Sequence, residues 1–113
     1  MPGVTLASRG DISGEIISEY VKDAGRPEVG IIGRGFKTSV DQAAWVNGTQ
    51  AHTLDYDDYF VLDRLTPYHP TAAILPAVLA VGEKNHLSGR DVLLAYITGF
   101  EVEARIALAC VKR

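Results

Sequence analysis

Apolar residues recur at helical spacing along much of the chain, whereas residues 1–10 look irregular. After this start, an apolar stripe predicts a first helix that ends near Ala24. The stripe consists of Ile16, Ile17, Tyr20 and Val21. Asp11 or Ser13 can cap the start of this helix, and Gly25 is suited to its C-terminal end.

A second helix is predicted from the T-S-V-D sequence that begins at Thr38, which fits a capping box with Asp41 as its acidic member. The apolar pattern carries this helix towards Leu54. Gly48 inside a helix costs about 1 kcal/mol relative to alanine, so we expect another backbone to cross closely there. The glycine-rich residues 29–35 predict either a small strand or an extended connector.

Two further helices follow in the second half of the chain. Pro70 is suited to the first position of a third helix that reaches about Asn85, and Pro76 should kink it. Ser88 and Asp91 form a second capping box, which opens a fourth helix that continues to the end. The pattern therefore predicts an all-α chain of about four helices, with residues 56–68 as a loop.

Two of these helices are unusually apolar for a chain of 113 residues. Residues 71–81 and 92–100 carry no charged side chain on any face. A helix that is apolar all round is normally enclosed, and a domain this small can hardly enclose two helices. We therefore expect the chain to be part of something larger, or to bury these faces in a homo-oligomer.

Composition excludes several classes of partner. A net charge of −3 and a pI near 5.5 give no basic face for nucleic acid. The longest uncharged apolar run, residues 70–82, is too short to span a membrane, and the start does not resemble a signal peptide. The single Cys110 cannot form an intrachain disulfide, so a cytoplasmic setting is expected.

Candidate chemistry gathers in residues 51–76, where carboxylates and imidazoles adjoin an apolar helix. The titratable groups are His52, Asp55, Asp57, Asp58, Asp63 and His69. Such groups beside buried surface are suited to proton transfer. His69 is the predicted N-cap of the third helix, where the positive end of the helix dipole attracts an anion and disfavours a charged imidazole. Alternatively, His69 only caps the helix and has no chemical role.

The other members of this stretch have simpler interpretations. His52 and Asp55 share a helix face if the second helix extends that far, and a structural pair is expected. Asp57 and Asp58 are expected to bond their own backbone in a turn. His52, Asp55 and His69 could be imagined around a metal ion, but the chain has no H-x-x-x-H or paired-cysteine spacing, so no metal site is predicted.

Three segments together resemble the MmgE/PrpD family, which includes 2-methylcitrate dehydratase, cis-aconitate decarboxylase and iminodisuccinate epimerase. They read AAWVNGTQAHTLDYDDY, HPTAAILPAVLAVGE and SGRDVLLAYITGFEVEARI. The likeness extends from about Ile12 to the C-terminus, and N-G-x-x-A-H-x-L-D-x-D-D together with H-P carries most of it. It implies that residues 1–113 are a partial helical domain, without the opening helices, later helices and lid domain of the family.

The resemblance also implies an activity and a site. Family members act on small di- and tricarboxylates by abstracting a proton next to a carboxylate, without a metal, and we expect no cofactor. Asp55 matches the first Asp of the D-x-D-D segment and His69 the histidine of H-P, so both are the predicted catalytic residues. Tyr59 stands where several members carry threonine, and with His52 it is a predicted substrate-binding residue. A second histidine and the lysines of the family's pocket would lie beyond Arg113.

Two hypotheses follow for the chain, with a third kept beside them. The first is a fragment of a lyase or isomerase on a small polycarboxylate, resembling 2-methylcitrate dehydratase. The second is a non-catalytic helical fragment that is stable only as an oligomer. The third is a binding module that retains half of a pocket. Because the expected site is incomplete, little or no turnover is predicted for the chain alone.

Overall fold

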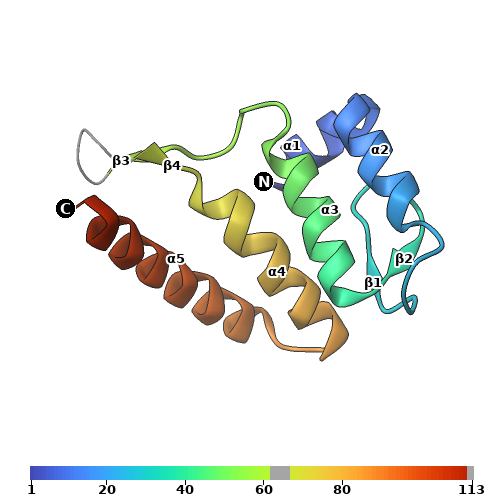
Figure 1. Ribbon diagram of the computed structural model, residues 1–113. Helices are drawn as coiled ribbons and strands as arrows, with labels where there is room; N and C mark the ends of the chain where they lie inside the picture. Colours follow the sequence, from blue (N-terminus) through green and yellow to red (C-terminus); the bar gives the residue numbers. More distant parts are fainter. Residues whose placement is uncertain (62–66, 112–113) are drawn as a thin grey trace.

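The computed structural model describes residues 1–61 and 67–111, which fold mainly into helices, as predicted (Figure 1). Asp63 of the acidic stretch lies outside the described residues. The helices are α1 (Pro2–Ala7), the 3₁₀ turn η1 (Ser8–Gly10), α2 (Ile12–Val21), α3 (Val40–His52), α4 (Pro70–Lys84) and α5 (Gly89–Val111). Helix α4 packs between α3 and α5, while α1 and α2 pack on α3.

Two short antiparallel strand pairs accompany the helices. Strand β1 (Val29–Gly30) pairs with β2 (Lys37–Thr38), so the glycine-rich segment contains a small strand rather than only a connector. Glu83 at the end of α4 accepts a hydrogen bond from the Gly30 amide at 3.1 Å, which ties this hairpin to α4. Strands β3 (Phe60–Val61) and β4 (Pro67–Tyr68) pair within the segment that was predicted to be a loop.

The prediction of an irregular start is wrong, because residues 2–10 form α1 and η1. Pro2 begins α1, as its fixed φ allows at a first helical turn. The apolar pattern missed this helix because its buried side chains are hydroxyls rather than hydrocarbons. Thr5 bonds the Met1 carbonyl, and Ser8 Oγ donates to the Gln50 carbonyl of α3 at 2.7 Å.

Two of the predicted side-chain caps form at α2 and α5, and the one predicted at α3 does not. Asp11 caps α2 by accepting from the Ser13 amide at 2.9 Å, and the Ser13 hydrogen bonds lower the Asp11 pKa. The Ser88 capping box also forms, since the Asp91 amide donates to Ser88 Oγ at 3.2 Å. At α3, however, the N-cap is Ser39. Thr38 lies in β2 instead, where its hydroxyl donates to the Ala24 carbonyl at 2.6 Å.

The hydrophobic core lies between α2, α3 and the β1–β2 hairpin. Its larger cluster consists of Ile17, Val21, Ile31 and Val46, and a smaller one of Val29, Ala43 and Ala80. Only half of the predicted α2 stripe is used, because Ile16 and Tyr20 are exposed. Helix α2 ends at Val21, one turn before the predicted end, and Gly25 adopts a left-handed φ of +79°.

Glycine allows the three long helices to approach one another. A Cβ on Gly48 of α3 would lie 3.1 Å from the Ala72 carbonyl oxygen of α4, which confirms the predicted close crossing. On the other side of α4, a Cβ on Gly99 of α5 would lie 2.8 Å from Ile74 Cγ2. Helix α4 passes through Pro76, whose ring packs against Gly48.

Helix α5 is not enclosed within the described chain, as expected for a domain too small to enclose two apolar helices. Its side chains at Leu93, Leu94, Ile97, Val102 and Ile106 are each at least half exposed. One face of α5 packs on α4, and Tyr96 shares a 2.6 Å hydrogen bond with Thr71 there. The outer face has no cover in the described chain, because α5 is the last helix of the row.

Within residues 1–61 and 67–111, every helix is too short or too polar to cross a membrane.

Candidate functional site

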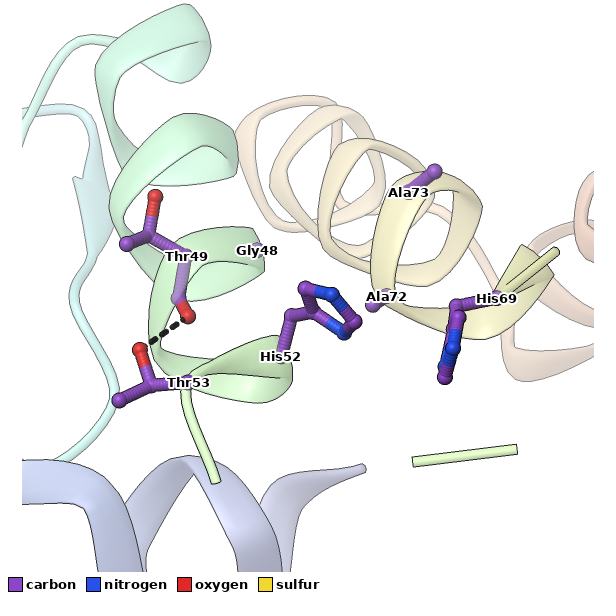
Figure 2. Close-up of a pocket in the computed structure, with 7 residues that line it drawn as sticks. All are labelled: Gly48, Thr49, His52, Thr53, His69, Ala72 and Ala73. Atoms are coloured by element: carbon purple, nitrogen blue, oxygen red, sulfur yellow. Dashed lines mark hydrogen bonds between the residues drawn. The ribbon is translucent and has the colours of Figure 1, made fainter. Parts of the chain in front are cut away.

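The C-terminal end of α3 and the N-terminal end of α4 lie side by side and form an open pocket of about 470 Å³ (Figure 2). Seven residues line it: Gly48, Thr49, His52, Thr53, His69, Ala72 and Ala73. Gly48, Thr49, His52 and Thr53 recur at helical spacing on one face of α3. This spacing is the sequence signal that could have identified the two threonines as lining residues.

His69 occupies the N-cap position of α4 and Pro70 the first position, as the sequence predicts. Within the described residues, the His69 side chain bonds no amide of the first turn, so it remains available to the pocket. The first amides of a helix have no intrahelical acceptor and carry the positive end of its dipole. The pocket mouth is therefore suited to an anionic group.

Asp57 joins the two pocket histidines, which corrects the prediction that it bonds only its own turn. Its carboxylate is 1% exposed, and its two oxygens lie 3.1 and 3.0 Å from His52 Nδ1. Its Oδ2 also lies 3.2 Å from His69 Nδ1. The predicted partner of His52 was Asp55, but α3 ends at His52 and the chain turns there, so the ion-pair partner is Asp57.

Asp55 lies at the rim of the pocket rather than in it. Its φ of +54° places it in a left-handed turn just after α3, and its side chain is 79% exposed. Its Oδ1 is 3.8 Å from His69 Nε2, which is an ion-pair distance rather than a hydrogen bond. The structure thus brings the two predicted catalytic residues together, with Asp55 on the Nε2 side of the imidazole and Asp57 on the Nδ1 side.

Aromatic rings surround His69 on two sides. The His52 ring lies edge-on with its centroid 4.6 Å away, and the Tyr59 ring lies edge-on at 5.4 Å. Both predicted substrate-binding residues therefore contact the predicted catalytic histidine. Tyr59 is itself 62% exposed, so it flanks the site instead of closing it.

The threonine hydroxyls of the pocket already have acceptors. Thr53 Oγ1 donates to the Thr49 carbonyl at 2.7 Å (Figure 2). Thr49 Oγ1 donates to the Trp45 carbonyl at 3.0 Å. An anionic ligand would therefore obtain its hydrogen bonds from the imidazoles and from the first amides of α4. Proton transfer at this pocket falls to the histidines and the two nearby carboxylates.

The fold also brings metal-ligand atoms together, although the sequence spacing predicts no metal site. His52, Asp55, Asp57 and His69 each offer one ligand atom, and these atoms lie within 4.8 Å of one another. The set is assembled from two helix ends and the turn between them. Spacing rules for metal motifs rely on pairs of His or Cys a few residues apart, and His52 and His69 form no such pair.

A second set of interacting titratable groups consists of Asp58, Tyr68 and Glu103. Burial, with the negative charges of Glu103 and Asp58, raises the pKa of Tyr68. Burial also raises the pKa of Glu103, and Asp58 adds to this effect. Tyr68 directly precedes His69, so a charge on α5, that of Glu103, influences the pKa of the residue next to the pocket histidine.

Comparison with known proteins gives a family match and several similar enzymes. A family model described as the MmgE/PrpD N-terminal domain matches residues 1–113. A cis-aconitate decarboxylase from Mus musculus is 35% identical over 86 residues, which are 73% of this chain and 15% of that protein. The human cis-aconitate decarboxylase is 38% identical over 68 residues, 57% of this chain and 13% of that protein. The cis-aconitate decarboxylase of Aspergillus terreus is 37% identical over 84 residues, 70% of this chain and 16% of that protein.

No solved structure gives a significant match to the chain. The matches to these decarboxylases cover only 13% to 16% of their own length. The family match nevertheless extends over all 113 residues and includes both the D-x-D-D turn and the H-P start of α4. The chain therefore belongs to the MmgE/PrpD family, through the N-terminal domain of that family.

Proposed function

We propose that the chain contributes one wall of the active site of a metal-independent lyase or isomerase that acts on small di- or tricarboxylates. The reaction proposed is proton abstraction next to a carboxylate, as in a 2-methylcitrate dehydratase. His69 exchanges the proton, and Asp55 is its polar partner at the rim. His52 and Tyr59 contact the substrate. Residues 1–113 are a partial helical domain, and a cytoplasmic setting is part of the same proposal.

One observation carries this proposal: an imidazole at the N-terminus of α4 lies in an open pocket between two carboxylates. The α4 dipole and its first amides attract a carboxylate of the substrate. That carboxylate would then hold the adjacent carbon near His69, which is 26% exposed and so reachable from solvent. A base must lie within hydrogen-bond reach of the proton that it removes, and His69 lines the pocket.

The described pocket is open on one side, which fits a site that needs further groups. Two carboxylates on its border would repel a polycarboxylate unless cations balance them. Asp57 is contacted by the two histidines, while Asp55 faces solvent. The chain alone should therefore bind polycarboxylates weakly and turn them over little or not at all.

A two-part experiment tests the proposal. In the first part, tricarboxylates are titrated into the chain and the histidine side-chain resonances are followed by NMR. His52 and His69 should shift, and His86, which lies at the other end of α4, should not. In the second part, residues of this chain replace the matching segment of the Aspergillus terreus cis-aconitate decarboxylase. His69→Ala should abolish the activity of that hybrid, and the proposal fails if activity is unchanged.

The alternative function, a helical fragment that oligomerises without catalysis, is favoured by a different observation. The outer face of α5 exposes Leu94 and Ile97 to 64% and 55%. Contiguous exposed apolar side chains of this kind normally mark an interaction surface. If the chain binds no polycarboxylate yet forms a defined homo-oligomer, this alternative holds. Binding without oligomerisation or turnover would instead indicate a half-pocket binding module.

A further inference from the structure

The chemistry of the pocket leaves one buried polar atom unexplained. His69 Nδ1 is buried and has no hydrogen-bond partner among the described residues. Buried polar atoms in folded proteins almost always have a partner, because an unsatisfied one costs about 1–3 kcal/mol. His69 Nδ1 lies 3.2 Å from Asp57 Oδ2, and at this distance a small rotation of the imidazole ring completes a hydrogen bond.

The buried carboxylate of Asp57 requires hydrogen-bond donors. Its side chain is 1% exposed, and a buried carboxylate is stable only when it is paired and hydrogen-bonded. His52 Nδ1 supplies one donor, at 3.0 Å from Oδ2. His69 Nδ1 is the second nitrogen close to the same oxygen.

We propose that Asp57 is a positioning residue that holds both pocket histidines through their Nδ1 atoms. A hydrogen bond to one ring nitrogen determines which tautomer a neutral imidazole adopts. An acceptor at Nδ1 keeps the proton there and leaves Nε2 with its lone pair. For His69, that lone pair is on the side of the exposed Asp55, where it can accept a proton from a substrate.

The arrangement assigns different roles to two aspartates of the D-x-D-D turn. Asp55 is exposed and near Nε2, so it can contact a ligand. Asp57 is buried and acts only through the histidines. The next residue, Asp58, influences Tyr68 and Glu103 and has no ion pair with either pocket histidine in the described chain. Asp58→Asn is therefore a matched control, since it removes the same charge from the same turn.

Long-range ¹H–¹⁵N correlation spectra of the 113-residue chain test this assignment without any activity. Above about pH 8, where a histidine of ordinary pKa near 6.5 is neutral, His52 and His69 should both show the Nδ1–H tautomer. Asp57→Asn should return one or both to the Nε2–H tautomer that free imidazole side chains favour. Asp58→Asn should leave both unchanged, and His86 is the internal reference. An Nε2–H tautomer at His69 in the unmodified chain overturns the proposal, whether or not any variant folds.

A kinetic measurement separates this inference from the proposed function on which its catalytic consequence rests. In the hybrid decarboxylase, Asp57→Asn should lower kcat by about 10²-fold, within the range attributed to general acid–base catalysis, with KM changed much less. Loss of activity in His69→Ala with no change in Asp57→Asn would defeat the positioning role alone. No change in either variant would defeat the proposed function as well.

Discussion

Gly48 of α3 lies directly beneath the backbone of Ala72 in α4, so that a Cβ at position 48 would come within 3.1 Å of the Ala72 carbonyl oxygen. This contact sets the distance between the two helices whose ends carry the pocket. Both residues also line the pocket, one turn away from His52 and His69 respectively. The separation of the two histidines therefore depends on a residue without a side chain.

Gly48→Ala is expected to destabilise the chain despite the better helix propensity of alanine. The propensity gain is about 1 kcal/mol, whereas overpacking against a backbone atom typically costs about 1–3 kcal/mol. We expect a net loss of about 1 kcal/mol in the free energy of unfolding, measured in urea. Gly89→Ala is the control, because a Cβ at the start of α5 would meet no atom within 4 Å. Equal stability changes in the two variants would contradict the close-crossing argument.

Gln50 is expected to be among the most sensitive buried polar residues. It is fully buried in α3 and accepts a hydrogen bond from Arg34 Nε at 2.9 Å. Gln50→Leu would leave that guanidinium without its buried acceptor, at a cost of about 2–3 kcal/mol. Thermal or urea unfolding measures this loss.

The matched control for Gln50 removes the other partner of the same guanidinium. Glu15 is 57% exposed and lies 2.6 Å from Arg34 Nη1. Exposed ion pairs contribute about 0–1 kcal/mol, so Glu15→Gln should change stability by less than 1 kcal/mol. If Glu15→Gln destabilised the chain more than Gln50→Leu, burial would not determine how much each Arg34 contact contributes to stability.

Glu103 should give the chain a stability that decreases with rising pH. Burial and Asp58 raise the pKa of Glu103 in the folded state above its ordinary value of 4.5. The folded chain therefore binds this proton more tightly than the unfolded chain, and stability falls as pH rises from 4.5 through the folded pKa. Glu103→Gln should remove this loss, so the variant should gain relative to the parent between pH 4 and pH 7.

Unfolding in urea at several pH values measures the effect of Glu103, with Glu101→Gln as the control. Glu101 is exposed on the same helix and pairs with Arg105 at 2.6 Å. That substitution should show no such relative gain at neutral pH. A Glu103→Gln difference that stays constant from pH 4 to pH 7 would rule out the raised pKa.

The outer face of α5 should make the isolated chain self-associate. Leu94 and Ile97 are 64% and 55% exposed there. Burying one such side chain in an interface contributes about 1.5–3 kcal/mol, so Ile97→Glu should weaken association at least about tenfold. Light scattering over a concentration series measures this self-association. Tyr56→Glu, at a residue that is 82% exposed outside α5, should have little effect. A cooperative, strictly monomeric chain would contradict the expectation.

Local signals predicted the helices well because each depends on neighbours within one turn. The apolar spacing gives α2, α3, α4 and α5, and the Ser88–Asp91 box and Pro70 place two of their starts correctly. Helix α1 and the η1 turn were not predicted because their buried residues are Thr5 and Ser8, whose hydroxyls are satisfied by backbone carbonyls. The Ser8 hydroxyl also donates to the Gln50 carbonyl of α3, and no local pattern contains a partner so distant in the sequence.

The sequence by itself determined a mainly helical chain and the family, and the family resemblance indicated Asp55 as the polar partner of His69. Only the tertiary structure decided that Asp57, rather than Asp55, is buried between two imidazoles. The reason is geometric: α3 ends at His52, and the left-handed turn at Asp55 redirects the chain so that Asp57 faces inward. If α3 had continued, Asp55 would have shared a helix face with His52. Because the chain turns at Asp55, Asp57 is the residue that pairs with His52 instead.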